Sequence, residues 1–178
     1  MNSTNKINNI DLINLAKLMA EKAHSTQSYG DMLPYMYHIN SVADFGYTYI
    51  PKTHPHFVEL ICALYLHDII EDQNVSYNDV KGYFGELVAE IVWALSGWGR
   101  NRKERNECSY KKIRKLELAK VAKLCDRLAN VTHSSSFNKG KIAMYRKENE
   151  EFLRNTEIDI SKDSLVVLLK EVLEKLLD

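Results

Sequence analysis

The segment from His67 to Asp72 gathers the side chains of this sequence that are best suited to chemistry. His67 and Asp68 are adjacent at the end of an apolar run, and Glu71 and Asp72 follow within one helical turn. Ionised carboxylates beside an imidazole at the end of an apolar helix carry a desolvation cost unless something compensates it. A bound cation is the simplest compensation, so this segment predicts part of a metal site.

A metal site of this kind needs donors from elsewhere in the chain, because a divalent cation held by side chains takes about four of them. Two candidates are His38, within a half-buried helical pattern, and Asp126, which closes a second apolar run. Taken alone, His38 is more often a hydrogen-bonded core histidine, and Asp126 an ion-pair partner of Lys123. The order His, His-Asp, Asp, each on a separate expected helix, is far more specific than any one of them.

Two imidazoles and two carboxylates would form a mixed nitrogen and oxygen donor set. Such a set suits Mn²⁺, Fe²⁺, Co²⁺ or Zn²⁺ better than Mg²⁺ or Ca²⁺, which prefer oxygen. A metal with open positions binds water and lowers its pKa from about 15.7 towards roughly 7. The resulting nucleophile could attack a phosphorus atom.

The blocks around these residues resemble the HD superfamily of metal-dependent phosphohydrolases, and more narrowly the RelA/SpoT-type (p)ppGpp hydrolase domains and their small stand-alone relatives. The resemblance spans residues 15–153 and rests on Lys22-Ala23-His24 with Gln27, Pro34-Tyr35 with His38, residues 63–72, Phe84-Gly85 and residues 123–130. It implies an all-helical HD-type bundle. It also implies one divalent transition metal, usually manganese, held by His38, His67, Asp68 and Asp126, with iron, cobalt, nickel and zinc as alternatives.

The resemblance further assigns proton transfer to the pair Glu71 and Asp72. A carboxylate that takes a proton from the attacking water, or delivers one to the leaving group, contributes about 10²- to 10⁴-fold in rate. The alternatives are an orienting role for Glu71 beside His67 and a helix-end role for Asp72. Which member of the pair acts stays open.

Substrate phosphates would need cations, and a basic segment offers four of them in six residues: Arg100, Arg102, Lys103 and Arg105. If its loop folds over the site, these side chains form a phosphate clamp; the alternative is a solvated surface turn. Asn130, which helical spacing places one turn after Asp126 on the same face, is a further candidate. So is Tyr145, because it matches a nucleotide-contacting tyrosine of the resembled family. His133 could face the same cleft, although a capping or solvated role is the alternative.

The sequence departs from the resembled family where that family grips the nucleotide. Basic residues follow the upstream glutamine in the (p)ppGpp hydrolases, and a proline follows the first histidine ligand. Here those places read Ser28-Tyr29 and Ile39. The departure leaves the metal chemistry intact and weakens the case for guanosine tetraphosphate as the substrate.

The elements that must position these residues are helices, because the apolar spacings are helical and the chain has only seven Gly and three Pro. The predicted helices cover residues 11–24, 34–45, 57–70, 76–83, 85–96, 113–130, 142–153 and 161–177. A Ser-rich loop is expected over 132–140. The leucine stripe of the last helix, with Asp163 in its first turn, is core packing or a self-association face, so a homo-oligomer stays open.

Length and composition predict one domain over residues 1–178, with the last helix packed on it. The 24 basic and 24 acidic residues balance, so net charge gives no argument for a nucleic acid or an anionic membrane as partner. The polar N-terminus, the lack of a long apolar stretch and three scattered cysteines favour a soluble cytoplasmic protein.

The sequence therefore predicts a metal-dependent phosphohydrolase that acts on a small phosphorylated nucleotide, with a (p)ppGpp-type 3′-pyrophosphate as the first substrate to test. The alternatives are a 5′-nucleotidase, a cyclic-nucleotide phosphodiesterase, a non-catalytic nucleotide-binding HD module, or an interaction domain that works through the leucine-rich last helix.

Overall fold

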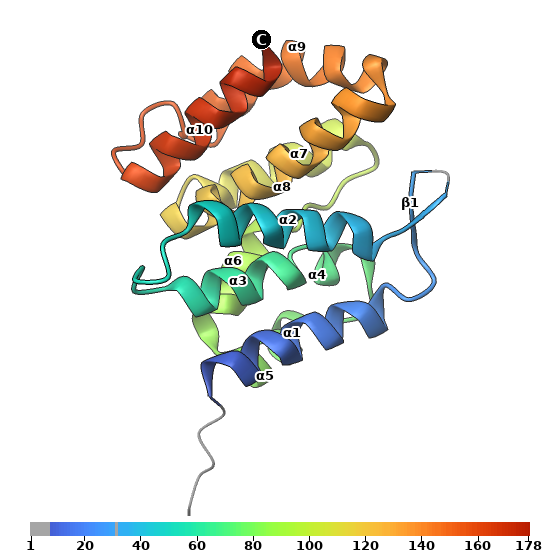
Figure 1. Cartoon of the computed structure of the whole chain (residues 1–178), viewed down its shortest axis with the longest axis vertical. Helices are drawn as coiled ribbons and strands as arrows, with labels where there is room; N and C mark the ends of the chain where they lie inside the picture. Colours follow the sequence, from blue (N-terminus) through green and yellow to red (C-terminus); the bar gives the residue numbers. More distant parts are fainter. Residues whose placement is uncertain (1–7, 31) are drawn as a thin grey trace, which may run out of the picture.

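The computed structural model describes residues 8–30 and 32–178; residues 1–7 of the polar N-terminus and residue 31 lie outside the described part. The helices in chain order are α1 (Asn9–Ala23), α2 (Met36–Tyr49), α3 (Phe57–Leu66), α4 (Ile69–Asp72), α5 (Tyr77–Phe84), α6 (Glu86–Leu95), α7 (Arg102–Ile113), α8 (Glu117–Phe137), α9 (Lys139–Asn155) and α10 (Ser164–Leu177). Strands β1 (Ser28–Tyr29) and β2 (Leu33–Pro34) form a short antiparallel hairpin between α1 and α2 (Figure 1). The predicted all-α fold is confirmed.

Helices α3 and α8 form the centre of the bundle. Every residue from Leu60 to Leu66 of α3 is buried, and α3 packs against α1, α2, α6 and α8. Helix α8 also packs against α2, α9 and α10. It lies between α9 and α10 on one side and α2 and α3 on the other (Figure 1). Each fully buried aliphatic side chain contributes about 1.5–3 kcal/mol. This core holds the start of α2, the end of α3 and the middle of α8 in a fixed relation to one another.

Side-chain caps define several helix starts. The side chains of Asn8, Asn101 and Asp163 accept hydrogen bonds from first-turn amides of α1, α7 and α10, and Ser76 and Asp79 form a capping box on α5. Each cap of this kind is worth about 1 kcal/mol. The cap by Asp163 corrects the predicted start of the last helix, which begins at Ser164 and leaves residues 161–163 outside it.

The basic segment 100–105 is a helix start and does not form the predicted loop. Helix α7 begins at Arg102 because the Asn101 side chain accepts from the Glu104 amide at 3.0 Å. Glu104 in turn accepts a 2.7 Å hydrogen bond from the Arg100 amide. These two bonds satisfy the amides of Glu104 and Arg100 at the start of the helix. They allow a helix to begin here although the segment has little apolar periodicity.

The loop predicted over residues 132–140 is also wrong, because α8 continues to Phe137. Val131 and Ser134 are buried on the inner face of α8, and Ser135 bonds its hydroxyl back to the Thr132 carbonyl at 2.8 Å. Tertiary burial thus outweighs the low helix propensity of serine. Helix α8 ends at Phe137, and the next residue, Asn138, caps α9 with its side chain.

Helix α10 packs on α8 with one face of its leucine stripe. Leu165, Leu169, Leu173 and Leu177 are buried, whereas Leu168 and Leu176 are 43% and 40% exposed. The stripe therefore serves core packing, and self-association through the exposed leucines stays a prediction. Across the described residues, no helix combines the length and the apolar character that a bilayer crossing requires.

Candidate metal centre and active site

A break in the backbone separates α3 from α4 at the centre of the site. The sequence predicted one helix over residues 57–70, but α3 ends at Leu66, and Asp68 has φ −101° and ψ 0°, away from α-helical values. On a regular helix, consecutive side chains point about 100° apart. The break allows His67 and Asp68, although adjacent, to meet in one cluster.

The cluster is completed by His38 from α2 and Asp126 from α8. Nε2 of His38 lies 3.2 Å from Nε2 of His67 and 3.3 Å from Oδ1 of Asp126, and Nε2 of His67 lies 2.9 Å from Oδ2 of Asp68. Donor atoms of His38, His67 and Asp126 all lie within 4.8 Å of one another, and these three side chains are buried. The fold brings all four predicted ligands together.

Hydrogen bonds orient the cluster from outside. Nδ1 of His67 lies 2.9 Å from the carbonyl oxygen of Leu64, which turns Nε2 inward. Asp126 accepts 2.6 Å from Nδ2 of Asn130 at Oδ1 and 2.8 Å from Nζ of Lys123 at Oδ2. The sequence placed Asn130 one turn from Asp126 and offered Lys123 as its ion-pair partner, and both contacts are present.

Tyr35 is a site residue that the sequence interpretation missed. Its hydroxyl donates a 2.5 Å hydrogen bond to Oδ2 of Asp68, and its ring stacks on His24 with centroids 4.9 Å apart. Pro34-Tyr35 formed part of the resemblance, but a tyrosine at a helix start carries no signal of its distant partner. Tyr35 thus orients Asp68 from the start of α2.

The charges in the cluster compensate one another. Burial disfavours the charged form of His67, but the carboxylates of Asp68 and Asp126 and the Leu64 carbonyl together outweigh burial and raise the pKa of His67 to about 9. Burial also opposes ionisation of Asp68 and Asp126, yet His67 holds the pKa of Asp68, and Lys123 that of Asp126, below its usual range. Two ionised carboxylates, the buried Asp126 and the partly exposed Asp68, stand beside two imidazoles. This is the donor set that a divalent transition metal prefers, and such an ion would displace the proton on His67.

The two candidate proton-transfer carboxylates lie in different environments. Glu71 is half-buried, accepts a 2.7 Å hydrogen bond from the Gly97 amide at Oε2, and has Nε of Arg105 3.7 Å from Oε1. Burial raises the pKa of Glu71. Asp72 is exposed and accepts a 2.8 Å hydrogen bond from Nε2 of Gln27.

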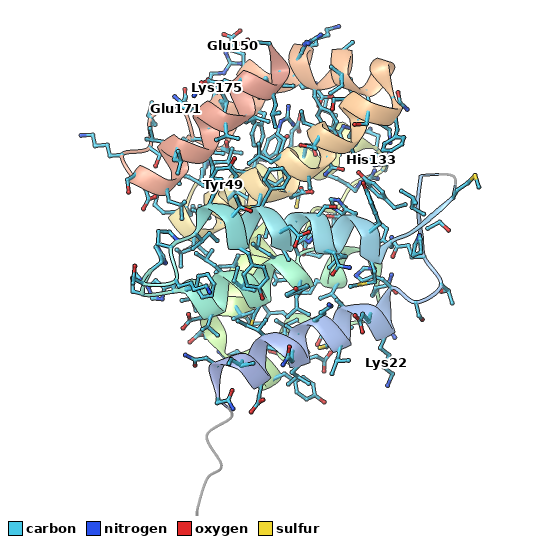
Figure 2. The ribbon with its side chains drawn as sticks, in the orientation of Figure 1. Lys22, Tyr49, His133, Glu150, Glu171 and Lys175 are labelled. Carbon is cyan, nitrogen blue, oxygen red and sulfur yellow. The ribbon has the colours of Figure 1, made fainter. Side chains whose placement is uncertain are left out.

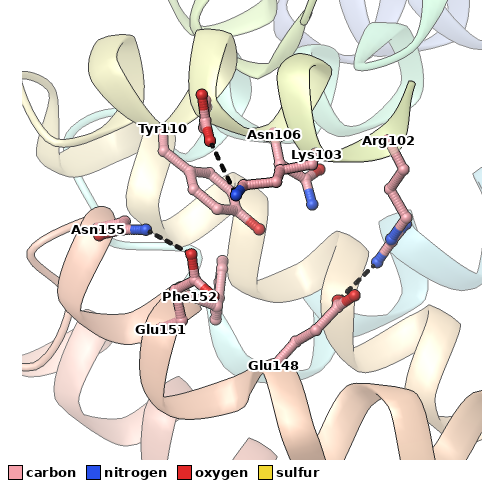
Figure 3. A pocket seen from close by; sticks show the side chains of 9 residues that line it. Arg102, Lys103, Asn106, Tyr110, Glu148, Glu151, Phe152 and Asn155 are labelled. Atoms are coloured by element: carbon pink, nitrogen blue, oxygen red, sulfur yellow. Dashed lines mark hydrogen bonds and ion pairs between the residues drawn. The ribbon is translucent and has the colours of Figure 1, made fainter. Parts of the chain in front are cut away.

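The four predicted phosphate-binding cations separate into two pairs. Arg105 reaches Glu71, and Arg102 lies 5.7 Å above the Tyr145 ring and pairs with Glu148 on α9 at 3.0 Å (Figure 3). Lys103 is 80% exposed and pairs loosely with Glu107 on its own helix. Arg100 is also exposed, and among the described residues neither Arg100 nor Lys103 forms an ion pair with the cluster.

A groove of about 330 Å³ runs between α7 and α9, with Tyr110 and Phe152 in its lining and the Arg102–Glu148 pair at one end (Figure 3). Tyr145 is buried beside it, with the Arg127 guanidinium 5.1 Å from its ring. Burial, followed by the nearby carboxylate of Asp126, raises the pKa of Tyr145. Tyr145 therefore lies near Arg102, at the end of this groove, and within electrostatic reach of Asp126 in the metal cluster.

An aromatic group covers the other side of the cluster. The Tyr29 ring stacks on His38 at 4.9 Å and 13°, its hydroxyl donates 2.9 Å to Asn130, and His133 packs against it at 4.7 Å. His133 thus faces the site, on the side where the β1–β2 hairpin projects (Figure 2). The sequence noted Tyr29 only as a departure from the resembled family, and its contacts make it part of the site.

Comparison with known proteins identifies relatives in the family that the sequence resembles. The chain is 30% identical over 144 residues to the bifunctional (p)ppGpp synthase/hydrolase SpoT of Escherichia coli, covering 76% of this chain and 20% of that protein. It is 29% identical over 181 residues to the guanosine-3′,5′-bis(diphosphate) 3′-pyrophosphohydrolase of Haemophilus influenzae, covering 90% of this chain and 26% of that protein. The chain therefore spans about a fifth to a quarter of the length of these relatives.

A solved structure has the same fold. It is described as "A metazoan ortholog of SpoT hydrolyzes ppGpp and plays a role in starvation responses" and superposes with a TM-score of 0.75 at 21% identity, covering 93% of both chains. No family model matches the chain. The predicted resemblance to RelA/SpoT-type hydrolase domains is confirmed by these relatives.

Proposed function

We propose that this homologue of the SpoT-type (p)ppGpp hydrolases is itself a metal-dependent phosphohydrolase that removes pyrophosphate from the 3′ position of a guanosine polyphosphate. The observation that carries the proposal is the convergence of His38, His67, Asp68 and Asp126, from three parts of the fold, in one cluster. The activity is inferred for the region over which the sequence resembles the family, residues 15–153, with α10 packed on it as part of one domain.

The proposed resident ion is a single divalent transition metal, manganese before iron, cobalt, nickel or zinc. The structure supports a metal through the mixed donor set and through the orienting bonds to His67, Asp68 and Asp126. Such an ion, when bound, supplies Lewis-acid activation of water and of a phosphoryl oxygen. The inward-facing Nε2 atoms of His38 and His67 are the nitrogen donors that would hold it.

Within the catalytic pair, we assign proton transfer to Glu71. Its half-buried carboxyl group has a raised pKa, which brings the group nearer to the neutral range where general bases work best. Its position is fixed by the Gly97 amide. Asp72 is exposed and accepts a hydrogen bond from Gln27. We assign it the role of orienting water or the leaving group at the solvent-exposed edge of the site.

The substrate contacts proposed for this chain follow from chemistry on either side of the cluster. Arg102 and Arg105 supply guanidinium groups for phosphate oxygens on the α7 side, where Arg102 lies over the ring of the buried Tyr145. Tyr29 and His133 present aromatic rings for a nucleobase on the hairpin side. Base stacking of this kind contributes about 1–3 kcal/mol.

The competing activities differ in their products. A 5′-nucleotidase would release phosphate and a nucleoside, a cyclic-nucleotide phosphodiesterase would yield a linear monophosphate, and a non-catalytic module would bind without turnover. The relatives are pyrophosphohydrolases, which favours pyrophosphate release. The half-buried Glu71 argues against a purely structural metal site, which has no use for an additional carboxylate.

The test is product identification. Purified protein loaded with Mn²⁺ is incubated with ppGpp, nucleoside 5′-monophosphates and cyclic nucleotides, and the products are separated by anion exchange. The proposal expects GDP and pyrophosphate from ppGpp, and no product from a His67→Ala protein prepared in parallel, which controls for contaminating phosphatases. Turnover of another nucleotide class alone, or of none, would overturn it.

A further inference from the structure

The loop that follows α6, residues 96–101, packs closely against the start of α7 at two glycines. A Cβ atom on Gly97 would lie 2.3 Å from the carbonyl oxygen of Arg105, and one on Gly99 would lie 2.4 Å from Cβ of Glu104. Neither glycine has a positive φ, so space and not backbone conformation demands glycine here. The loop and the first turns of α7 are in backbone contact.

Lys112, further along α7, fastens the other side of this loop. Its ammonium group donates to the carbonyl oxygens of Trp93, at 2.5 Å, and of Ser96. It also lies 4.6 Å from the Trp93 ring and 4.5 Å from the Trp98 ring, which themselves pack 4.6 Å apart. One cation thus ties the end of α6 to the indole of the following loop.

The residue between these anchor points is Gly97, whose amide donates 2.7 Å to Oε2 of Glu71. We propose that Lys112 is a positioning residue. It acts through Trp93 at the end of α6 and Trp98 in the 96–101 loop, and so holds the Gly97 amide on Glu71. The inference deepens the function proposed above and depends on it for its catalytic meaning. It assigns a role to a lysine, two tryptophans and two glycines that neither the metal cluster nor the substrate contacts use.

The physical consequence concerns the orientation and charge of one carboxylate. With Oε2 bound to the amide, the other oxygen of Glu71 is left to face the reacting groups, with Arg105 3.7 Å away. The amide also stabilises the ionised form and so opposes the effect of burial. The further charged groups that act on Glu71 are Asp68, Asp72, Lys112 and Lys123.

The first test compares Lys112→Met with Lys111→Met, the exposed lysine beside it on α7. Methionine keeps the apolar stem between the two indoles and removes the bonds to the Trp93 and Ser96 carbonyls. A catalytic group displaced by about 1 Å loses up to about 100-fold in rate. We expect Lys112→Met to lower kcat about 10- to 100-fold with KM unchanged, and to move the acid limb of the pH–rate profile to higher pH. Lys111→Met is expected to do neither.

A double-mutant cycle shows whether Lys112 acts through Glu71. In a Glu71→Gln background, Lys112→Met is expected to lower the residual kcat no further, because the group that it positions is gone. An independent loss of the same size in both backgrounds would overturn the proposal. A second pair of variants avoids Lys112 altogether: Gly97→Ala is expected to reproduce the defect, whereas Gly82→Ala, whose Cβ meets no atom within 4 Å, is expected to leave activity unchanged.

Fluorescence separates this inference from the proposed function. Trp93, near the end of α6, and Trp98, in the loop, are the only tryptophans of the sequence, so emission excited selectively from tryptophan reports this region without the ten tyrosines. Lys112→Met changes the emission directly, because its ammonium lies against both indoles, so the coupling is tested at Glu71. If the loop is coupled to the site through the Gly97 amide, Glu71→Ala shifts the emission spectrum and the remote Glu150→Ala does not (Figure 2). Absence of ppGpp turnover with the Glu71→Ala shift present would reject the function and keep the coupling. Unchanged emission in Glu71→Ala would reject the coupling.

Discussion

The hydroxyl of Tyr35 donates a 2.5 Å hydrogen bond to Oδ2 of Asp68, the same oxygen that lies 2.9 Å from Nε2 of His67. The bond connects the start of α2, which also carries His38, to the break between α3 and α4. It therefore ties two of the three parts of the fold that build the cluster to each other.

Tyr35→Phe should weaken metal binding while leaving the fold intact. The substitution removes the bond to the Asp68 carboxylate and keeps the ring on His24. Loss of such an orienting partner costs about 10- to 100-fold in metal affinity. Calorimetric titration with Mn²⁺ measures the effect, and Tyr83→Phe, at an exposed ring, is the control. Equal affinities in the two variants would show that Tyr35 does not orient the ligand.

Lys123→Met should change the metal-free protein more than the metal-loaded one. Lys123 donates 2.8 Å to Oδ2 of Asp126, and its removal leaves a buried carboxylate short of one partner, at a cost of about 1–3 kcal/mol. A bound cation would compensate that carboxylate in its place. We expect Mn²⁺ to raise the melting temperature of Lys123→Met by more than that of the wild type. A smaller increase would mean that Lys123 supports the metal site.

The dependence of kcat on pH at saturating Mn²⁺ should report Glu71. Burial raises the pKa of this group, and a general base must be ionised, so activity should fall as pH drops through a pKa above the ordinary 4.5. Glu71→Gln should lower kcat by about 10²- to 10⁴-fold and abolish this limb. Asp72→Asn is expected to keep the limb. The opposite pattern would exchange the roles of the two carboxylates.

Tyr29→Ala should raise KM for a nucleotide substrate about tenfold, in line with the loss of one stacking surface. Tyr29→Phe keeps the ring on His38 and loses only the hydroxyl bond to Asn130, so its KM should stay near that of the wild type. Steady-state kinetics on ppGpp compare the two. A KM that is unchanged in Tyr29→Ala would remove the hairpin from the substrate site.

Three of the four members of the cluster could be predicted from the sequence because each interrupts a local pattern, and His38 was added as their partner from its place in a separate helix. His67, Asp68 and Asp126 close apolar runs, and the spacing of four residues predicted the contact between Asp126 and Asn130 that the structure contains. Tyr35 and Gly97 carry no such signal. Their bonds to Asp68 and Glu71 join residues 33 and 26 positions apart, so only tertiary packing creates them.

Two local patterns were misread for opposite reasons. The charge run at 100–105 hides a helix start, which Asn101 and Glu104, three residues apart, could have indicated as a capping pair. The serines around Ser134 indicated a loop, but burial of Ser134 against the core keeps α8 helical. Propensity describes the exposed face of α8, and packing decides the buried one.

The most direct test of the account is the Mn²⁺ stoichiometry of the purified protein and of its Asp126→Asn variant. Both proteins are stripped with a chelator, dialysed against the same Mn²⁺ concentration, and analysed for bound metal, with folding checked by circular dichroism. The account predicts one ion per wild-type chain and far less in the folded variant, because Asp126 contributes one of the four converging donors. Equal metal content in the two proteins, or none in the wild type, would contradict it.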